Sequence, residues 1–273
     1  MAVSRLAMYV AVYFFAAMTT VLSAPLFAET IVVGGVGSLT GLAKLLGAEY
    51  AKKNPGFDIR VIEPPIGTKG AIRALAAGKL DLALSGRPLN VDEAGLAKPW
   101  LQTPLVIVTL GGKSQGLSRR QIADIYAGRQ GQWDDNKPIR LVLRGDQESE
   151  TKVLRALSPE VDAAVTEALK RPGLPIAEND LDALEILSRF PGSLGTSSLG
   201  LIKVSGSRLT ALPIDGVAPS AKAMAEGRYP WRRQYFLITS TTTRPSVAAF
   251  VAWLNSVQAQ ALAAKLDYMP IVP

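Results

Sequence analysis

The chain has 273 residues, with no cysteine, no histidine, and 30 basic against 23 acidic side chains, a formal net charge of +7. These counts exclude disulfides, thiol nucleophiles, histidine-based triads and zinc sites built from cysteine or histidine. With 48% hydrophobic residues, 24 Gly and 18 Pro, the composition is that of a folded protein with one large domain or two medium ones.

Residues 1–28 have the layout of a secretory signal peptide. Arg5 precedes an uncharged apolar run over residues 6–22, and small residues follow up to Ala28. We expect cleavage after Ala28. An uncleaved membrane anchor is the alternative, because the run approaches the roughly 20 residues that span a bilayer. The sequence therefore predicts a protein that is soluble in the periplasm.

The charge that remains after cleavage is scattered along the chain. Without residues 1–28 the chain keeps 29 basic and 23 acidic side chains, and its basic residues form no run longer than pairs such as Arg119-Arg120. A solvated basic surface gives this pattern, whereas a nucleic-acid track needs clustered charge. We therefore expect no nucleic-acid partner.

Residues 29–89 alternate between strand and helix patterns. A β-branched strand over residues 31–33 precedes a helix that carries Leu42, Leu45, Leu46 and Tyr50 at helical spacing and ends at residues 54–56. A strand over 57–65, a helix over 67–80 and a strand over 81–89 follow. This order predicts a parallel sheet with helices on its faces, and ligands on such sheets bind where strands end and helices begin.

A second α/β unit is expected over about residues 111–228. It follows an apolar strand over 104–112 and contains helical segments over 117–133 and 149–170, a strand over 138–145, and a helix plus glycine-rich strand over 181–202. A strong strand over 233–243 comes next. One amphipathic helix of five or six turns is predicted over 246–268.

Several enzyme motifs match in part. Ser149 and Lys152 fit the S-x-x-K motif of serine β-lactam enzymes, but no S-D-N or K-T-G segment follows. The segment 112–114 fits the end of a P-loop, yet Ile107 stands where its first glycine is required. The glycines of residues 34–41 do not have the dinucleotide-binding spacing. The sequence thus predicts no enzyme, no cofactor and no metal site.

Polar residues gather at three turns that precede predicted helices, at 37–40, 67–70 and 144–149. A helix N-terminus presents unpaired N–H groups and the positive end of the helix dipole. Three such turns together would form an oxyanion site without a catalytic group. The alternative, which spacing alone favours, is that Ser38 and Thr68 are helix N-caps.

The order of these segments resembles the phosphate-binding proteins of bacterial ABC transporters, which are two-lobed periplasmic solute-binding proteins of type 2 topology. The segments that carry the resemblance are GSLTGLAKLLGAEY, IGTKGAIRALAAGKLDLALSGRPL, LSRRQIADIYAGRQGQWDD, the turn at 144–151 and FPGSLGTSSLGLI. The likeness covers nearly all of the chain after residue 28. Its most specific piece is the segment 117–133.

The resemblance implies an α/β fold of two lobes, each a mixed sheet flanked by helices, with a cleft between them. Lobe one would contain residues 29–109 and 229–273, and lobe two residues 110–228. Hinge strands would lie at 106–110 and 232–239. A monomer is expected.

The resemblance also implies site residues. In the family, the loop before the first helix, a G-S/T-S turn, the Asp of an S-D-A-P-L segment and an R-x-D-G-S-G-T turn hold the anion. The matching positions here are Ser38, Leu39, Thr68, Gly86, Arg144, Glu148, Ser149 and Glu150. Arg87 is either a replacement contact or a solvated loop charge. The candidate ligand-binding residues are Ser38, Leu39, Thr68, Arg87, Arg144 and Ser149.

The chain departs from the family pattern at two places. Gly86 replaces the Asp that accepts a proton from hydrogen phosphate, so selection of phosphate over sulfate would be lost. Glu148 and Glu150 replace small residues of the anion turn. Either they point outward or the ligand is not a simple anion, and Arg144 is then either a ligand contact or their ion-pair partner.

The expected function is capture of a small, phosphate-like oxyanion by closure of two lobes. Its partner would be an ABC permease or a membrane sensor protein. One alternative is an envelope interaction protein on the same fold that has lost anion binding. Another is a hydrolase that uses Ser149 and Lys152.

Overall fold

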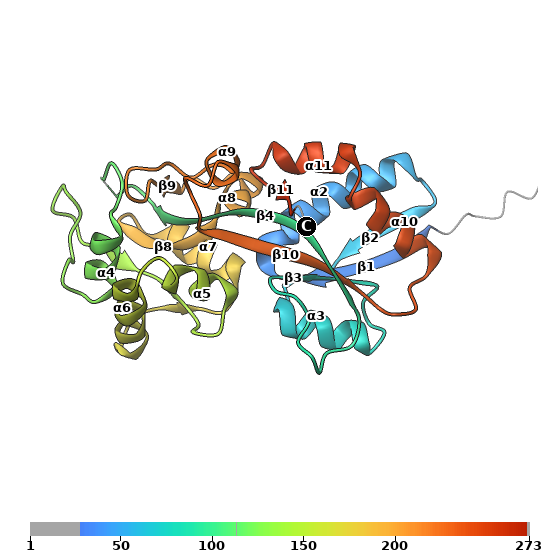
Figure 1. The fold of residues 1–273 in the computed structure, drawn as a ribbon, viewed down its shortest axis with the longest axis horizontal. Coiled ribbons are helices and arrows are strands. Elements are labelled where there is room, and N and C mark those ends of the chain that lie inside the picture. Colours follow the sequence, from blue (N-terminus) through green and yellow to red (C-terminus); the bar gives the residue numbers. More distant parts are fainter. Residues whose placement is uncertain (1–27, 113, 272–273) are drawn as a thin grey trace, which may run out of the picture.

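The computed structural model describes residues 28–112 and 114–271, so the predicted signal peptide lies almost entirely outside the described residues. The chain forms two lobes side by side (Figure 1). We call the lobe that contains β1 and α2 lobe one, and the lobe that contains α4 and α6 lobe two. Strand β4 runs through both.

Lobe one begins with the predicted alternation of strands and helices. Its first elements are β1 (Glu29–Gly35), α2 (Gly37–Lys53), β2 (Phe57–Val61), α3 (Gly67–Ala76) and β3 (Leu82–Ser85). Strand β1 pairs in parallel with β2 and β3. Gly35 is needed at the end of β1, because a Cβ there would overlap the backbone carbonyl of Leu84.

Two long antiparallel strands make the sheet mixed and connect the lobes. They are β4 (Leu96–Thr109) and β10 (Arg232–Thr239). Strand β4 pairs with β10 from Leu96 to Pro104 and then, from Leu105, with β8 (Ser193–Ser198) and partly β9 (Thr210–Leu212). The predicted strand began only at Pro104, which is wrong: β4 begins eight residues earlier, where its first residues are mostly exposed and lack an apolar pattern.

Lobe two is built on β8 and surrounded by short helices. Its remaining elements are α4 (Arg119–Tyr126), β5 (Arg140–Leu141), β6 (Leu143–Arg144), α5 (Ser149–Arg155), α6 (Pro159–Lys170), β7 (Ile176–Ala177), α7 (Asp180–Arg189), α8 (Leu199–Ser205) and α9 (Ala221–Ala225). Strand β5 pairs with β8, whereas β6 pairs with β7 in a separate sheet. The single strand predicted over 138–145 is therefore divided between two sheets.

The C-terminal segment returns to lobe one as α10 (Pro245–Leu254), α11 (Val257–Ala264) and β11 (Met269–Pro270). The prediction of one long helix is wrong. Asn255 ends α10, and the Ser256 hydroxyl accepts a hydrogen bond from the N–H of Ala259 as the N-cap of α11. No helix within residues 28–112 and 114–271 could cross a membrane by itself, and α10 and α11, which pass together by length and composition, are bent by 51°.

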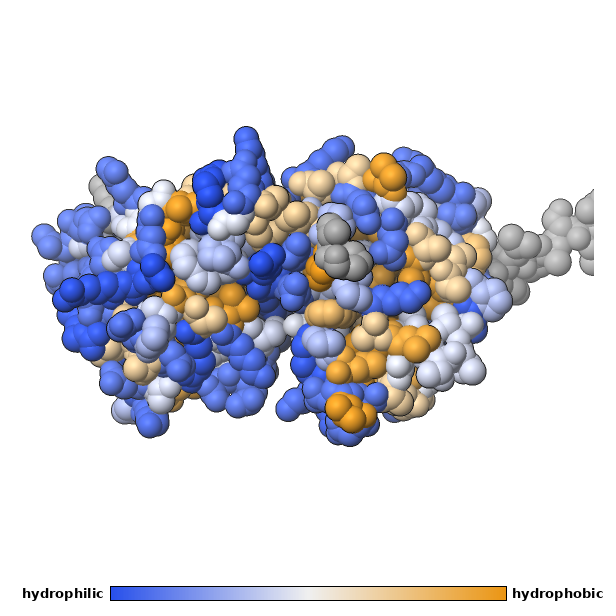
Figure 2. All heavy atoms as spheres, in the orientation of Figure 1, coloured by the Kyte–Doolittle hydropathy of each residue, from blue (hydrophilic) through white to orange (hydrophobic). Residues whose placement is uncertain are grey.

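Each lobe has its own apolar core. In lobe one, Tyr50 packs against Phe250 and Trp253, and in lobe two, Trp133 and Tyr126 are among the buried side chains. The visible face of lobe two is largely hydrophilic, and the molecule narrows where the lobes meet (Figure 2). The polar groups described next lie at this junction.

Candidate functional site

Four charged side chains are buried where the lobes meet. They are Arg144 of β6, Glu150 of α5, Asp180 of α7 and Arg233 of β10, with exposed fractions of 6%, 1%, 6% and 4%. We call these four residues the buried charge cluster. Charges this deeply buried persist only when they are paired and hydrogen-bonded.

Arg233 is at the centre of the cluster. Its guanidinium lies 2.5 Å from Oδ1 of Asp180 and 3.5 Å from Oε2 of Glu150, and it donates to Oγ of Ser149 at 3.2 Å. Arg233 comes from the strand at the lobe junction, whereas its three partners belong to lobe two. The cluster therefore ties the junction to the helices α5 and α7.

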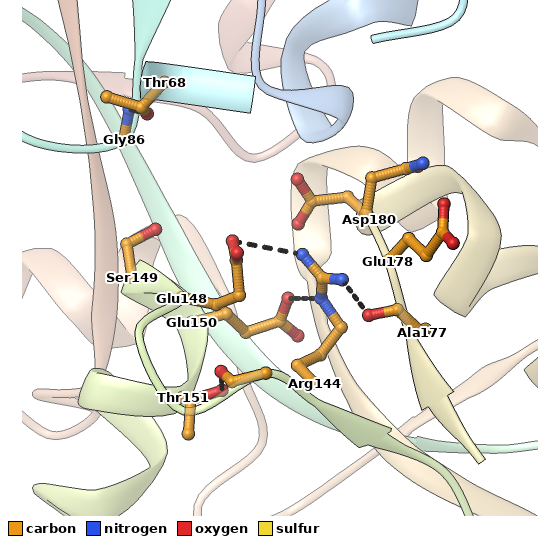
Figure 3. Close-up of polar contacts among 12 residues, drawn as sticks. Thr68, Gly86, Arg144, Glu148, Ser149, Glu150, Thr151, Ala177, Glu178 and Asp180 are labelled. Carbon is orange, nitrogen blue, oxygen red and sulfur yellow. Dashed lines mark hydrogen bonds and ion pairs between the residues drawn. The ribbon is translucent and has the colours of Figure 1, made fainter. Parts of the chain in front are cut away.

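Arg144 is the second guanidinium of the cluster and pairs with Glu150. Its Nε lies 3.6 Å from Oε2 of Glu150, and its terminal nitrogens contact Glu148 at 3.3 Å and the carbonyl of Ala177 at 2.6 Å (Figure 3). The Glu148 side chain is 47% exposed, so only Glu150 points fully inward. The two guanidiniums and two buried carboxylates balance in charge.

The N-terminus of α2 faces this cluster from lobe one. The N–H of Ser38 donates to Oδ2 of Asp180 at 3.1 Å. A Cβ on Gly37 would lie only 3.2 Å from that of Asp180, so glycine permits the close approach of α7. The carboxylate of Asp180 thus lies at the N-terminal ends of α2 and of its own helix, where both helix dipoles favour negative charge.

Thr68 and Gly86 form the second contact from lobe one. The Thr68 hydroxyl accepts a hydrogen bond from the N–H of Gly86 at 2.9 Å. A Cβ on Gly86 would lie 2.8 Å from Oγ of Ser149 and 3.7 Å from Oγ1 of Thr68. Figure 3 shows Thr68 and Gly86 across from Ser149. The N-termini of α3 and α5 therefore meet beside the buried charge cluster.

Several buried polar atoms around the cluster lack a hydrogen bond of normal geometry to any described residue. They are Oγ of Ser38, Nε of Arg144, Oε1 of Glu150, Oγ of Ser198, Nε of Arg233 and Oη of Tyr235. Burying such an atom without a partner costs about 1–3 kcal/mol. Most of these atoms have only longer or poorly aligned contacts, Tyr235 with Ser38 and Ser198, Glu150 with Thr196, and Nε of Arg144 with Glu150. A polar ligand could replace such contacts with better hydrogen bonds.

The pKa values of the two buried carboxylates, Glu150 and Asp180, shift in opposite directions. Burial raises the pKa of Glu150, the carboxylate of Asp180 raises it further, and the nearby guanidiniums offset this only in part. Burial would also raise the pKa of Asp180, but Arg233, Arg144 and the hydrogen bonds from Arg233 and Ser38 lower it to about 2. Asp180 is therefore a fixed anion, and Glu150 is the carboxylate that takes up a proton more easily.

Four of the six residues predicted to bind ligand come together. Ser38 contacts Asp180, Ser149 contacts Arg233, and Thr68 lies with Gly86 opposite Ser149. Arg144 joins them through Glu150, as the ion-pair partner of the acids. The idea that Ser38 and Thr68 are N-caps is wrong, because Val36 and Ile66 occupy those positions and neither helix has a side-chain cap.

The other two predicted residues lie elsewhere. Leu39 is fully buried in the apolar core, and its N–H donates to the carbonyl of Val36. Arg87 makes two hydrogen bonds to the carboxylate of Glu93, at 2.6 and 2.7 Å. The hydrogen bonds from Arg87 lower the pKa of Glu93 to about 2. Arg87 is therefore occupied within its own loop.

Sequence reasoning missed Asp180 and Arg233. Asp180 has the pattern of an ordinary first-turn acid beside the N-cap Asn179, so nothing in its surroundings distinguishes it. Arg233 offered a signal, since it alternates with the apolar positions Tyr235 and Leu237 on the buried face of the strand. A buried charge at such a position needs a partner from another element.

The backbone N–H of Ser38 and the guanidinium of Arg233 are donors of the kind that bind oxyanions. The Ser149 hydroxyl is hydrogen-bonded to Arg233. The Arg233 guanidinium stays protonated, so it cannot act as a general base for that hydroxyl. Within the described residues, no group of three or more acidic side chains could hold a metal ion.

Comparison with known proteins supports the two-lobed fold. The phosphate-binding protein PstS of Bacillus subtilis is 24% identical over 220 residues, which cover 76% of this chain and 69% of that protein. Two solved structures are similar over 89% of this chain and all of their own: a candidate phosphate ABC transporter substrate-binding protein from Clostridium perfringens (TM-score 0.74, 17% identity) and an ABC-type phosphate transport receptor from Vibrio cholerae (TM-score 0.60, 19% identity).

These likenesses confirm the predicted α/β architecture of type 2 periplasmic binding proteins and the resemblance to phosphate-binding proteins seen in the sequence. The domain family described as the PBP superfamily domain matches residues 23–258. That match includes parts of both lobes and every residue of the site described above, and the chain therefore belongs to the PBP superfamily.

Proposed function

We propose that the chain is an exported solute-binding protein that captures a small, phosphate-like oxyanion for an ABC permease or a membrane sensor protein. One observation carries this proposal. An oxyanion group, the carboxylate of Asp180, is already held between the lobes by the N–H of Ser38 and the guanidinium of Arg233. A helix N-terminus and a guanidinium are the donors that bind free phosphate or sulfate in other proteins.

The relatives support the same ligand class. The Bacillus subtilis relative is a phosphate-binding protein, and the Clostridium perfringens structure contains bound phosphate. We propose Ser38, Thr68, Ser149 and Arg233 as the ligand contacts in this chain. Arg144 then acts through the acids that it pairs with, and the chain carries out no bond chemistry.

The ligand selectivity that we propose follows from Gly86. A protonated oxyanion such as hydrogen phosphate is distinguished from sulfate by an acceptor for its proton. Gly86 has no side chain to provide one, and a larger residue would contact Ser149. We therefore expect phosphate and sulfate to bind with similar affinity.

Export and assembly are part of the proposal. Cleavage after Ala28 would release a periplasmic monomer that begins at Glu29, with lobe one at 29–109 and 229–273 and lobe two at 110–228. Mass spectrometry of the protein from a periplasmic extract tests the cleavage site. Size-exclusion chromatography with light scattering tests the monomer.

Calorimetric titration of residues 29–273 with phosphate, sulfate, molybdate and small organic anions tests the function. Saturable binding of one anion per chain supports it, and Arg233→Ala should abolish that binding. No heat of binding across the panel would overturn it.

A second function is favoured by the charge balance of the buried cluster. Because Glu150 and Asp180 neutralise Arg144 and Arg233, the site has no net positive charge to offer an anion. An envelope interaction protein on the same fold would show this feature. It would bind no anion in the titration, and a protein partner would have to be sought instead.

A further inference from the structure

Asp180 connects the two lobes with both of its carboxylate oxygens. Oδ2 accepts a hydrogen bond from the N–H of Ser38 on α2, and Oδ1 accepts one from Arg233 at the lobe junction. Its own helix does not need this side chain, because the Asn179 side chain already caps the N–H groups of Leu181 and Asp182. The contacts of Asp180 are therefore directed to the opposite lobe.

Polar groups that Asp180 does not use lie around its carboxylate. Nε of Arg233 is buried next to it without a hydrogen bond to a described residue. The hydroxyls of Ser38 and Tyr235 interact with each other rather than with Asp180. A carboxylate presents two oxygens, whereas a tetrahedral oxyanion presents four. A tetrahedral oxyanion could therefore use donors around Asp180 that the carboxylate leaves unused.

The charges of the cluster prevent Asp180 and a solute anion from sharing this position. Two guanidiniums already balance the carboxylates of Asp180 and Glu150. An added anion would be an uncompensated buried charge in contact with another carboxylate, which is strongly unfavourable. If Asp180 withdraws, Arg233 and the N–H of Ser38 become free for the solute.

A groove passes beside the segment that carries Asp180, although the Asp180 side chain itself does not line it. This groove of about 560 Å³ lies between the lobes and is lined by Glu63, Pro64 and Pro65 of lobe one and by residues on both sides of Asp180, including Asn179 and Leu181. Parting of the lobes along this groove would bring the carboxylate into water. Such parting of the lobes would give the carboxylate a route to exchange with a solute.

We propose that Asp180 is a tethered competitor: its carboxylate occupies the oxyanion position at the N-terminus of α2 and must leave before a solute anion binds there. This inference rests on the proposed oxyanion site and adds its regulation. Asp180 holds the empty lobes together and lowers the affinity of the site, so that only an anion that binds more strongly than a tethered carboxylate is captured.

The test is sulfate titration of residues 29–273 and of two variants, Asp180→Ala and Asp180→Asn. Sulfate is chosen because it keeps its charge across the working pH range. Both variants should bind sulfate at least tenfold more tightly than the unchanged chain. Asp182→Ala is the matched control, because Asp182 lies in the same helical turn but contacts the N–H of Glu178, and it should change nothing.

A second measurement does not depend on sulfate. Acetate or formate can replace the missing carboxylate, so either should raise the melting temperature of Asp180→Ala by several degrees while leaving that of the unchanged chain and of Asp182→Ala unaffected. Asp180→Asn keeps the shape of the side chain, which guards against loss of folding in the alanine variant.

The outcomes separate this inference from the proposed function. If the unchanged chain binds sulfate and both Asp180 variants bind it equally or more weakly, Asp180 only positions Arg233 and the inference is overturned, whereas the proposed function stands. If only the variants bind, the inference holds and capture by the natural chain fails. If no protein binds sulfate and acetate has no effect, both are overturned.

Discussion

The two lobes contribute to their junction with different kinds of groups. Lobe one supplies uncharged donors and acceptors at helix N-termini, the N–H of Ser38 and the Thr68–Gly86 pair. Lobe two supplies charged side chains, among them Arg144, Glu150 and Asp180. The donors of lobe one depend only on where the helices begin, but the charges of lobe two depend on one another.

This difference indicates where substitutions should be costly. A backbone N–H keeps its position as long as α2 folds, and α2 packs into the core of lobe one. A buried charge that loses its partner keeps its full desolvation cost. The cluster should therefore govern stability as well as binding, whereas the lobe-one turns should govern binding alone.

Arg233→Ala should give the largest effect. It removes the guanidinium that contacts both Asp180 and Glu150, so the free energy of unfolding should fall by about 3–5 kcal/mol. Chemical denaturation of the ligand-free protein measures this. Arg189→Ala is the control, since its ion pair with Glu185 is mostly exposed and should contribute about 1 kcal/mol or less. Equal losses would contradict the distinction between the two sites.

Arg144→Ala should have a smaller effect because Glu150 keeps its contact with Arg233. Loss of the hydrogen bonds to Glu148 and Ala177 should lower the unfolding free energy by about 1.5–3 kcal/mol. The affinity for an anion should fall only because Glu148 and Glu150, without Arg144, repel the anion more strongly. An unchanged melting temperature together with lost anion binding would instead make Arg144 a direct ligand contact.

Glu150→Gln should change how stability depends on pH. Since the pKa of Glu150 is raised above its ordinary value near 4.5 in the folded chain, the native state binds its proton more tightly than the unfolded state. The stability of the natural chain should therefore fall, relative to Glu150→Gln, as the pH rises from about 4.5 toward the pKa of the folded state, by about 1.4 kcal/mol for each pH unit in that interval. Melting temperatures of both proteins between pH 4 and 8 measure this, and parallel curves would exclude it.

The smallest expected difference concerns selectivity. The natural chain should bind phosphate and sulfate within about tenfold of each other, or about 1.4 kcal/mol. The double variant Gly86→Asp/Ser149→Ala adds a proton acceptor and removes the hydroxyl that would meet it, and it should shift the preference toward phosphate. Competitive titration decides this, with Ser149→Ala alone as the control. A strong phosphate preference in the natural chain would point to Glu150 as the acceptor.

Local sequence was sufficient where structure depends on neighbouring residues. The alternation of apolar strands and amphipathic helices predicted β1, α2, β2, α3 and β3, and family resemblance identified Ser38, Thr68 and Ser149 at helix starts. The predictions were wrong where the apolar spacing of one helix continues past the residue at which that helix ends. The apolar spacing of 246–268 continues past Asn255 and Ser256, whose capping ends one helix and begins another.

The sequence by itself determined the two α/β units, the secretory leader pattern and the turns that precede α2, α3 and α5, because each depends on short-range spacing. The tertiary structure alone decided which charges meet. Asp180 and Arg233 are 53 residues apart, and nothing local marks either as the partner of the other. Arg87, by contrast, pairs with Glu93 in its own loop. Coulomb attraction acts through space and strengthens with burial. The pairing of Asp180 with Arg233 is therefore decided only when the two lobes assemble.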